Sequence, residues 1–259
     1  MSRVLTAAVI VCLAFSPVWA QKGPDPPTGS PVAPTTTGGP DAFGYTFFDN
    51  NEPECPFQYI DIVGTGAAQS HADDTSTTIN LGGPAFDFYG TPQTQVGFGS
   101  NGYLAFGSVA TDFTNDCPAP NALDPDNIVA GYWDDLSPNL GGPAIDDYFQ
   151  YFANCPRPGR FPAVPGCNVF QWNTCFFGSA CASVEQNLEI ILYDSYDIVF
   201  QYQQTTQTGA SATIGIENSD ASIGLTYSCN VGGSVGPGSA VCFFHPNPVP
   251  VALESFSAE

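Results

Sequence analysis

Residues 95–106, QVGFGSNGYLAF, decide the fold, because two short runs containing aromatic residues flank a central Ser-Asn-Gly. Asn and Gly tolerate positive φ at both central positions of a tight turn, so Asn101-Gly102 predicts a two-residue hairpin loop. Such a loop pairs Ser100 with Tyr103 and Phe98 with Ala105. The stretch therefore predicts two adjacent antiparallel strands.

The same register predicts which side chains of this hairpin are in the core. Successive side chains of a strand point to opposite faces of the sheet. Leu104 and Phe106 then face away from Phe98 and Tyr103. We expect Leu104 and Phe106 in the core, and Phe98 and Tyr103 on the outer surface beneath a covering loop.

Short β-rich runs separated by Gly, Pro, Asn and Asp recur on both sides of the hairpin, without sustained helical periodicity. The runs are FQYIDI (57–62), TTINL (77–81), FDFYG (86–90), NIVAGYW (127–133), DYFQYF (147–152), NVFQW (168–172), LEIILY (188–193), DIVFQYQQ (197–204), SATIGIE (211–217) and IGLTYSC (223–229). This spacing predicts an all-β fold, an antiparallel β-sandwich of the jelly-roll-like kind. In 188–193 and 197–204, alternation predicts one face toward the core and the other toward solvent.

The two ends of the chain differ in composition from its centre. Residues 1–20 combine Arg3, an apolar run and Val-Trp-Ala, which predicts a secretory signal peptide cut before Gln21. Residues 21–42 are rich in Pro, Gly and Thr and predict a flexible linker. We expect the β-sandwich domain over 43–244 and a C-terminal tail or extra strand over 245–259.

Cysteine usage agrees with export. Beyond the signal peptide the chain keeps an even number of cysteines, which are Cys55, Cys117, Cys155, Cys167, Cys175, Cys181, Cys229 and Cys242. An even count in an exported chain predicts disulfides, and no CxxC spacing indicates zinc. Local loop closure predicts the pairs Cys229–Cys242 and Cys155–Cys167.

The chain is strongly acidic, with 25 Asp and Glu against 4 Lys and Arg and a net charge of −21. Such a chain repels nucleic acid and anionic membrane surfaces, so we expect neither nucleic acid binding nor membrane insertion after signal removal. The charge leaves open a solubilising coat, a cation site or a basic partner.

Paired carboxylates are the best candidates for a metal site. Asp73-Asp74 and Asp134-Asp135 lie in predicted loops, as does Asp146-Asp147. Calcium takes six to eight oxygen ligands, which loops bearing the first two pairs supply if the fold brings them together. The expectation is no cofactor, with structural calcium as the open alternative.

Catalysis has weaker support in the sequence. Two carboxylates flanking a sugar cleft would be drawn from Glu185, Glu189 and Glu217, and the two imidazoles, His71 and His245, lack the sequence context of a known catalytic motif. We expect no catalytic residues. We also expect Trp133 and Trp172, the tryptophans beyond the signal peptide, to pack in the core.

The order of the motifs is similar to that of a known module. SNGYLAFG (100–107) followed by GYWDDL (131–136), within residues 43–228, resembles a β-sandwich module of bacterial secreted proteins, often found beside extracellular peptidases and surface proteins and similar to the nidogen-type extracellular domain. Two departures are Asp194-Ser195-Tyr196, where such modules usually have a glycine turn, and the cysteine-bearing stretch 155–181.

The resemblance implies a secreted or cell-surface, non-catalytic module that acts in binding, adhesion or structural display, with an extracellular protein or glycan as its partner. The alternative is a glycan-acting hydrolase or carbohydrate-binding protein that uses acidic and aromatic groove residues.

Overall fold

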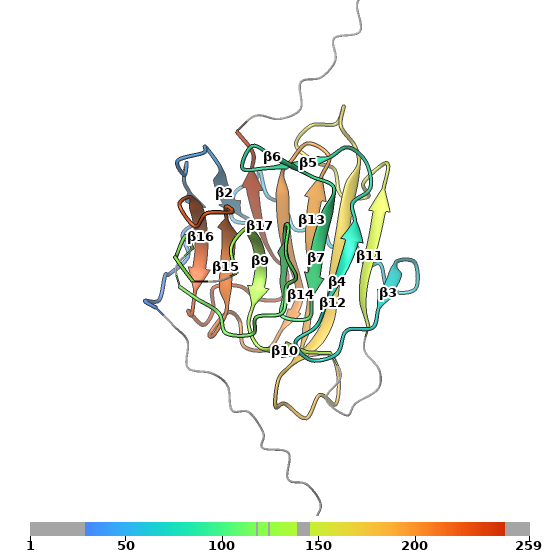
Figure 1. The fold of residues 1–259 in the computed structure, drawn as a ribbon, viewed down its shortest axis with the longest axis vertical. Coiled ribbons are helices and arrows are strands. Elements are labelled where there is room, and N and C mark those ends of the chain that lie inside the picture. Colours follow the sequence, from blue (N-terminus) through green and yellow to red (C-terminus); the bar gives the residue numbers. More distant parts are fainter. Residues whose placement is uncertain (1–28, 118, 124, 139–145, 247–259) are drawn as a thin grey trace, which may run out of the picture.

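The computed structural model describes residues 29–117, 119–123, 125–138 and 146–246. Its strands form two antiparallel sheets that face each other (Figure 1). Among these residues, the larger sheet has the order β1 (Thr37–Gly38), β2 (Thr46–Asp49), β17 (Ser239–Phe244), β14 (Ile198–Thr205), β13 (Gln186–Tyr193), β12 (Cys167–Phe176), β11 (Asp147–Phe152) and β3 (Ala67–Gln69), with β10 (Leu136–Ser137) also paired to β12. The smaller sheet has the order β16 (Gly224–Cys229), β15 (Thr213–Glu217), β9 (Ile128–Trp133), β8 (Tyr103–Ala105), β7 (Gln95–Gly99) and β4 (Ser76–Asn80). A separate hairpin joins β5 (Phe86–Phe88) and β6 (Thr91–Gln93). The predicted all-β sandwich is confirmed.

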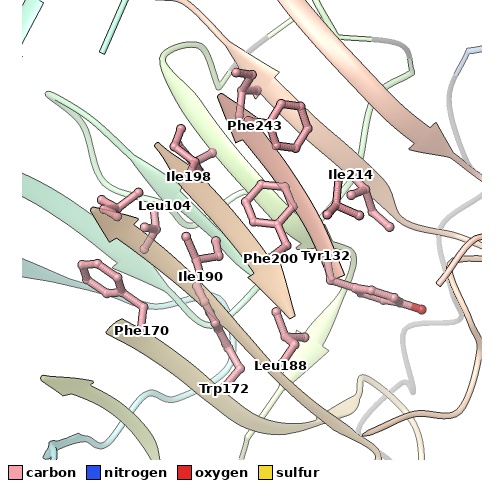
Figure 2. Packing of buried hydrophobic residues seen from close by; sticks show 14 of the residues in the cluster. Leu104, Tyr132, Phe170, Trp172, Leu188, Ile190, Ile198, Phe200, Ile214 and Phe243 are labelled. Atoms are coloured by element: carbon pink, nitrogen blue, oxygen red, sulfur yellow. The ribbon is translucent and has the colours of Figure 1, made fainter. Parts of the chain in front are cut away.

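The main core lies between the two sheets. Figure 2 shows Leu104 of the smaller sheet and Phe170 and Phe200 of the larger one in this cluster. The alternating apolar residues of β13 and β14 face it as predicted, since Leu188, Ile190, Leu192, Ile198, Phe200 and Tyr202 all belong to the cluster. Trp172 lies in this core, and Trp133 is buried on the other face of the smaller sheet.

The outer face of the larger sheet is also buried, so the expectation of a solvent-facing side is wrong. Residues 55–66, here named the strap, cover it and form a second apolar cluster with β12, β13, β14 and β17. Three polar side chains, the polar row, hold alternate backbone groups of the strap. The pairs are Gln201 with Gln58 (2.8 Å from Nε2 to the carbonyl), Glu189 with Ile60 (3.1 Å to the amide) and Gln171 with Ile62 (2.8 Å to the amide).

Residues 107–112 cover the outer face of the smaller sheet. A Cβ built on Gly99 would lie 2.0 Å from the Ala110 carbonyl oxygen, so this close approach requires glycine. Asp112 fastens the segment, because its amide donates to the Tyr103 hydroxyl (2.8 Å) and its carbonyl accepts the Trp133 indole N–H (3.1 Å). Tyr103 is therefore buried beneath a loop, as predicted.

The hairpin between β7 and β8 differs from the prediction by one residue. Gly97 pairs with Ala105 and Phe98 with Leu104, so the loop has three residues, Ser100 to Gly102. Of these three loop residues, only Gly102 has positive φ, at 74°. A turn ending in one left-handed residue is the usual three-residue hairpin loop.

This register turns Phe98 inward, which corrects its predicted outer position. Phe98 lies in the main core with Leu104 and Phe106, and its ring packs edge-on against Trp172 at a centroid distance of 4.6 Å. The positions predicted for Leu104 and Phe106 are correct.

The turn between β13 and β14 departs from the glycine expected of the resembling modules. Tyr196 adopts φ of 70° there, a conformation unusual for an aromatic residue. Its ring lies edge-on against His245 at 5.4 Å. Packing of the side chain therefore offsets the backbone strain.

All eight cysteines beyond the signal peptide form disulfides: Cys55–Cys242, Cys117–Cys229, Cys155–Cys167 and Cys175–Cys181. The predicted Cys155–Cys167 bridge is present, and the predicted Cys229–Cys242 bridge is wrong. Instead, Cys242 holds the strap across 187 residues, and Cys229 joins Cys117 across 112. Loop closure within the sequence does not reveal these long-range partners.

The linker prediction fails for part of its range. Val32 exchanges two backbone hydrogen bonds with Cys229, both of 2.9 Å, and β1 pairs with β2 at a sheet edge. An edge strand needs backbone pairing rather than hydrophobic periodicity. The predicted signal peptide (1–20) and residues 247–259 of the tail lie outside the described residues. None of the described residues belongs to a helix long and apolar enough to cross a membrane.

The disulfide pattern predicts that the chain without residues 1–20 has no free thiol. Thiol titration of denatured, unreduced protein should give less than one reactive group per chain, and a non-reducing digest should link the peptides of Cys55 and Cys242. Two or more thiols, or a peptide linking Cys229 to Cys242, would contradict the pattern.

Gly102→Val should destabilise the protein strongly. A Cβ at Gly102 would lie 2.0 Å from the Tyr132 carbonyl oxygen, in addition to the strain of positive φ. Gly107→Val is a matched control, because Gly107 has φ of 76° with nothing within 4 Å of its Cβ position. The control should cost about 1–3 kcal/mol, and Gly102→Val clearly more. Equal melting temperatures for the two variants would refute the turn.

The polar row predicts a fall in stability with rising pH. Burial raises the pKa of Glu189 from 4.5 to about 8. Its contribution is therefore complete below pH 4.5 and is lost as pH rises through 8. Thermal melts from pH 5 to 8.5 should show a smaller decline for Glu189→Gln than for wild type. Glu185→Gln, which removes a charge at a half-buried site, controls for net charge, and identical slopes for all three proteins would exclude Glu189 as a source.

Candidate functional site

Three of the predicted aspartates converge at one end of the sandwich. Carboxylate oxygens of Asp73, Asp74 and Asp135 all lie within 4.8 Å of one another. Asp73 and Asp74 belong to the loop between β3 and β4, and Asp135 lies between β9 and β10. Asp73 is exposed, Asp74 half-buried and Asp135 buried. We name these three residues the acid triad.

Asn101 of the hairpin loop joins the two segments that carry the acid triad. Its side chain is fully buried, and Nδ2 donates to Asp74 Oδ1 at 3.0 Å. Its Oδ1 accepts the Leu136 amide at 3.0 Å, one residue beyond Asp135. The hairpin therefore positions both halves of the triad.

His71 fastens the loop that carries Asp73 and Asp74. Its Nδ1 lies 2.8 Å from Asp147 Oδ2, and both side chains are buried. Asp147 also accepts the Asn173 amide at 3.1 Å. Burial raises the pKa of Asp147 to about 6, although the bonds to His71 oppose this shift. This pair has a structural role in placing the loop.

Asp134 is not part of the acid triad. Its Oδ1 accepts the Asp135 amide at 2.8 Å, and its Oδ2 accepts the Ser211 hydroxyl at 2.6 Å. Burial raises the pKa of Asp134 to about 6. These two contacts engage the Asp134 carboxylate, and it is not among the aspartates whose oxygens lie together.

A pocket of about 230 Å³ adjoins the acid triad. Asp134 and Asp135 line it together with Phe113, Phe177 and Gln207. The pocket is small compared with typical ligand sites of about 300–1,000 Å³. It is suited to one group of a larger ligand, held between aromatic and polar surfaces.

The three glutamates nominated for hydrolysis do not form a facing pair. Glu189 is buried beneath the strap, where it accepts the Ile60 amide. Glu185 accepts the Phe176 amide at 3.1 Å, and Glu217, on the smaller sheet, accepts the Asn121 amide at 2.8 Å. Each carboxylate therefore has a separate structural contact.

The acid triad has the chemistry of a hard-cation site. Three carboxylates are half the smallest usual ligand count of calcium, and backbone carbonyls or water complete such sites. Asn101 and three residues of the pocket, Phe113, Phe177 and Gln207, were not among the predicted site residues. The Asn-Gly sequence indicated a turn, but the use of the Asn side chain depends on segments that only the fold brings close.

Comparison with known proteins supports a nidogen-like module. A family model described as NIDO related matches residues 44–234. No curated protein and no solved structure matches the chain. Because the family match spans most of the sequence, including every strand of the smaller sheet and the acid triad, the chain belongs to the NIDO-related family.

Proposed function

We propose that this protein is a secreted or cell-surface binding module, without catalytic residues, that contacts an extracellular glycan or protein through the acid triad and its adjoining pocket. Membership of the NIDO-related family and four disulfides support an extracellular module. Bacterial origin and a role in adhesion stay predictions.

The observation that carries this proposal is the convergence of the acid triad beside a pocket on loops at one end of a rigid sandwich. Binding residues commonly lie on loops that a rigid scaffold positions. Here the Asn101 and His71 contacts fix those loops to both sheets. Aromatic, amide and carboxylate side chains around one small pocket favour a sugar ring over an extended peptide.

Calcium is the ion that we propose for the acid triad. Carboxylates whose oxygens lie within 4.8 Å repel one another unless a cation or a proton neutralises them. A cation would also present open positions to ligand hydroxyls. This proposal replaces the expectation of no cofactor, because the sequence did not show that Asp135 meets Asp73 and Asp74.

Calcium should stabilise the protein at concentrations too low to screen charge. Sodium chloride should raise the melting temperature of wild type by reducing repulsion among its acidic groups. Calcium at 0.2 mM should add several degrees at equal ionic strength, by mass action on a bound site. Asp73→Asn should lose the calcium increment, and Asp146→Asn, outside the triad, should keep it. An identical response to calcium and sodium would refute the ion site.

Ligand binding is tested separately with immobilised glycans and matrix proteins. At least one immobilised glycan should retain the wild-type protein in the presence of calcium. The amount of protein retained should fall at least tenfold in EDTA or with Asp73→Asn. Binding to matrix proteins alone would replace the glycan with a protein partner. A failure to bind any probe, or binding unchanged by both treatments, would contradict the proposed site.

A further inference from the structure

A second pocket lies at the opposite end of the sandwich from the acid triad. Asp135 adjoins β10, which pairs with Phe176 at one end of β12, whereas Tyr193 of this pocket pairs with Cys167 at the other end. Ten residues of β12 separate these ends by about 30 Å. Figure 1 shows the loop between β11 and β12 at the end away from β10.

This pocket, here named the arginine pocket, contains two basic side chains of an acidic protein. Its volume is about 250 Å³, and Arg157 and Arg160 both line it. Within the described residues, Arg157 and Arg160 are the only Lys or Arg side chains. The Cys155–Cys167 disulfide closes the loop that carries them. Tyr193, Val199 and Phe244 supply apolar walls.

Arg160 has unused hydrogen-bonding capacity. Its guanidinium carbon lies 4.6 Å from the Phe161 ring centre and 4.4 Å from that of Phe244. Nε and Nη2 bind Asp197 at 3.2 and 2.8 Å, and Nη2 also donates to the His245 carbonyl. Nη1 makes no hydrogen bond to the described residues. The side chain is 34% exposed, so a ligand can reach it.

Arg157 is a buried cation without an ion-pair partner among the described residues. It is 4% exposed and donates to the Tyr193 hydroxyl at 2.9 Å and to the Pro56 carbonyl at 3.0 Å. Its Nε has no hydrogen-bond partner in the part of the chain that the structure describes. Glu189 lies close enough to Arg157 to interact with it electrostatically, but burial raises the pKa of Glu189 to about 8 and so disfavours its charged form.

A buried guanidinium without a compensating anion is unfavourable, and a bound carboxylate would offset that cost. Glu54 and Asp197 also line the pocket, so a ligand rich in negative charge would be repelled. The volume admits one residue rather than a longer peptide. These features together favour a single carboxylate attached to an apolar group.

We propose that the arginine pocket binds the C-terminal residue of a partner polypeptide. Its chain-terminal carboxylate pairs with Arg160 Nη1 in the field of Arg157, and its aromatic or aliphatic side chain lies against Tyr193, Val199 and Phe244. Capture of a terminal carboxylate is an established mode of peptide recognition.

The test uses the secreted protein and N-acetyl-L-phenylalanine as the probe, with N-acetyl-L-phenylalaninamide as its uncharged match, both titrated by calorimetry or NMR. The free acid should bind at least tenfold more tightly than the amide. Aspartic acid blocked at both termini, which carries a side-chain carboxylate, should bind more weakly than the free acid. Equal affinity for acid and amide, or no binding of the acid, would overturn the proposal.

Variants assign the binding to this pocket. Arg160→Gln should lower the affinity for the free acid at least tenfold and leave the affinity for the amide unchanged. Arg160→Lys should retain part of the preference for the acid over the amide. Asp73→Asn should have no effect, so failure of this proposal is distinguishable from failure of the acid triad. If Arg160→Gln does not fold, the comparison of acid with amide on wild type still decides. Undiminished acid binding in folded Arg160→Gln would refute the assignment.

Discussion

The buried amide of Asn101 is the contact on which the hairpin and the candidate site both depend. A two-residue loop would need positive φ at Asn101, whereas the three-residue loop assigns that conformation to Gly102 alone. The Asn101 side chain then bonds to Asp74 and to the amide of Leu136. Removing a buried polar partner leaves donors and acceptors unsatisfied, which costs about 1–3 kcal/mol for each group. One side chain therefore joins strand register to the position of the acid triad.

Coverage of both outer faces explains why so many strand positions are buried. The strap covers the larger sheet, and residues 107–112 cover the smaller one. The strap is not a strand of either sheet, so its backbone N–H and C=O groups need hydrogen-bond partners other than a neighbouring strand. Gln171, Glu189 and Gln201 supply them from adjacent strands in one register. Polar residues on a strand can thus indicate a covered face as well as a solvent-facing one.

The sequence predicted those features that depend on neighbouring residues. Alternation in β13 and β14 identified their core-facing side chains, and a loop of eleven intervening residues identified the Cys155–Cys167 bridge. Prediction from the sequence failed where contacts between distant segments, or the exact length of a loop, decide the structure. The pairing of Cys229 with Cys117 follows from packing between distant parts of the chain that local patterns do not relate. The inward position of Phe98 follows from a hairpin loop of three residues where the sequence predicted two. The acid triad was predicted in part. Its three aspartates were among the predicted metal ligands, but only the folded structure shows that they lie together and that Asp134 does not join them.

The distribution of charge separates the two ends of the molecule chemically. With a net charge of −21, long-range repulsion disfavours anions over most of the surface and attracts cations. The acid triad increases that attraction locally, and the arginine pocket opposes it only at short range, where Asp197 already neutralises Arg160. An anion reaching Arg157 must therefore gain enough from direct contact and apolar burial to exceed the repulsion of the whole chain. This requirement favours a ligand with one carboxylate and an apolar side chain over a multiply charged one, and screening by salt should help rather than hinder its approach.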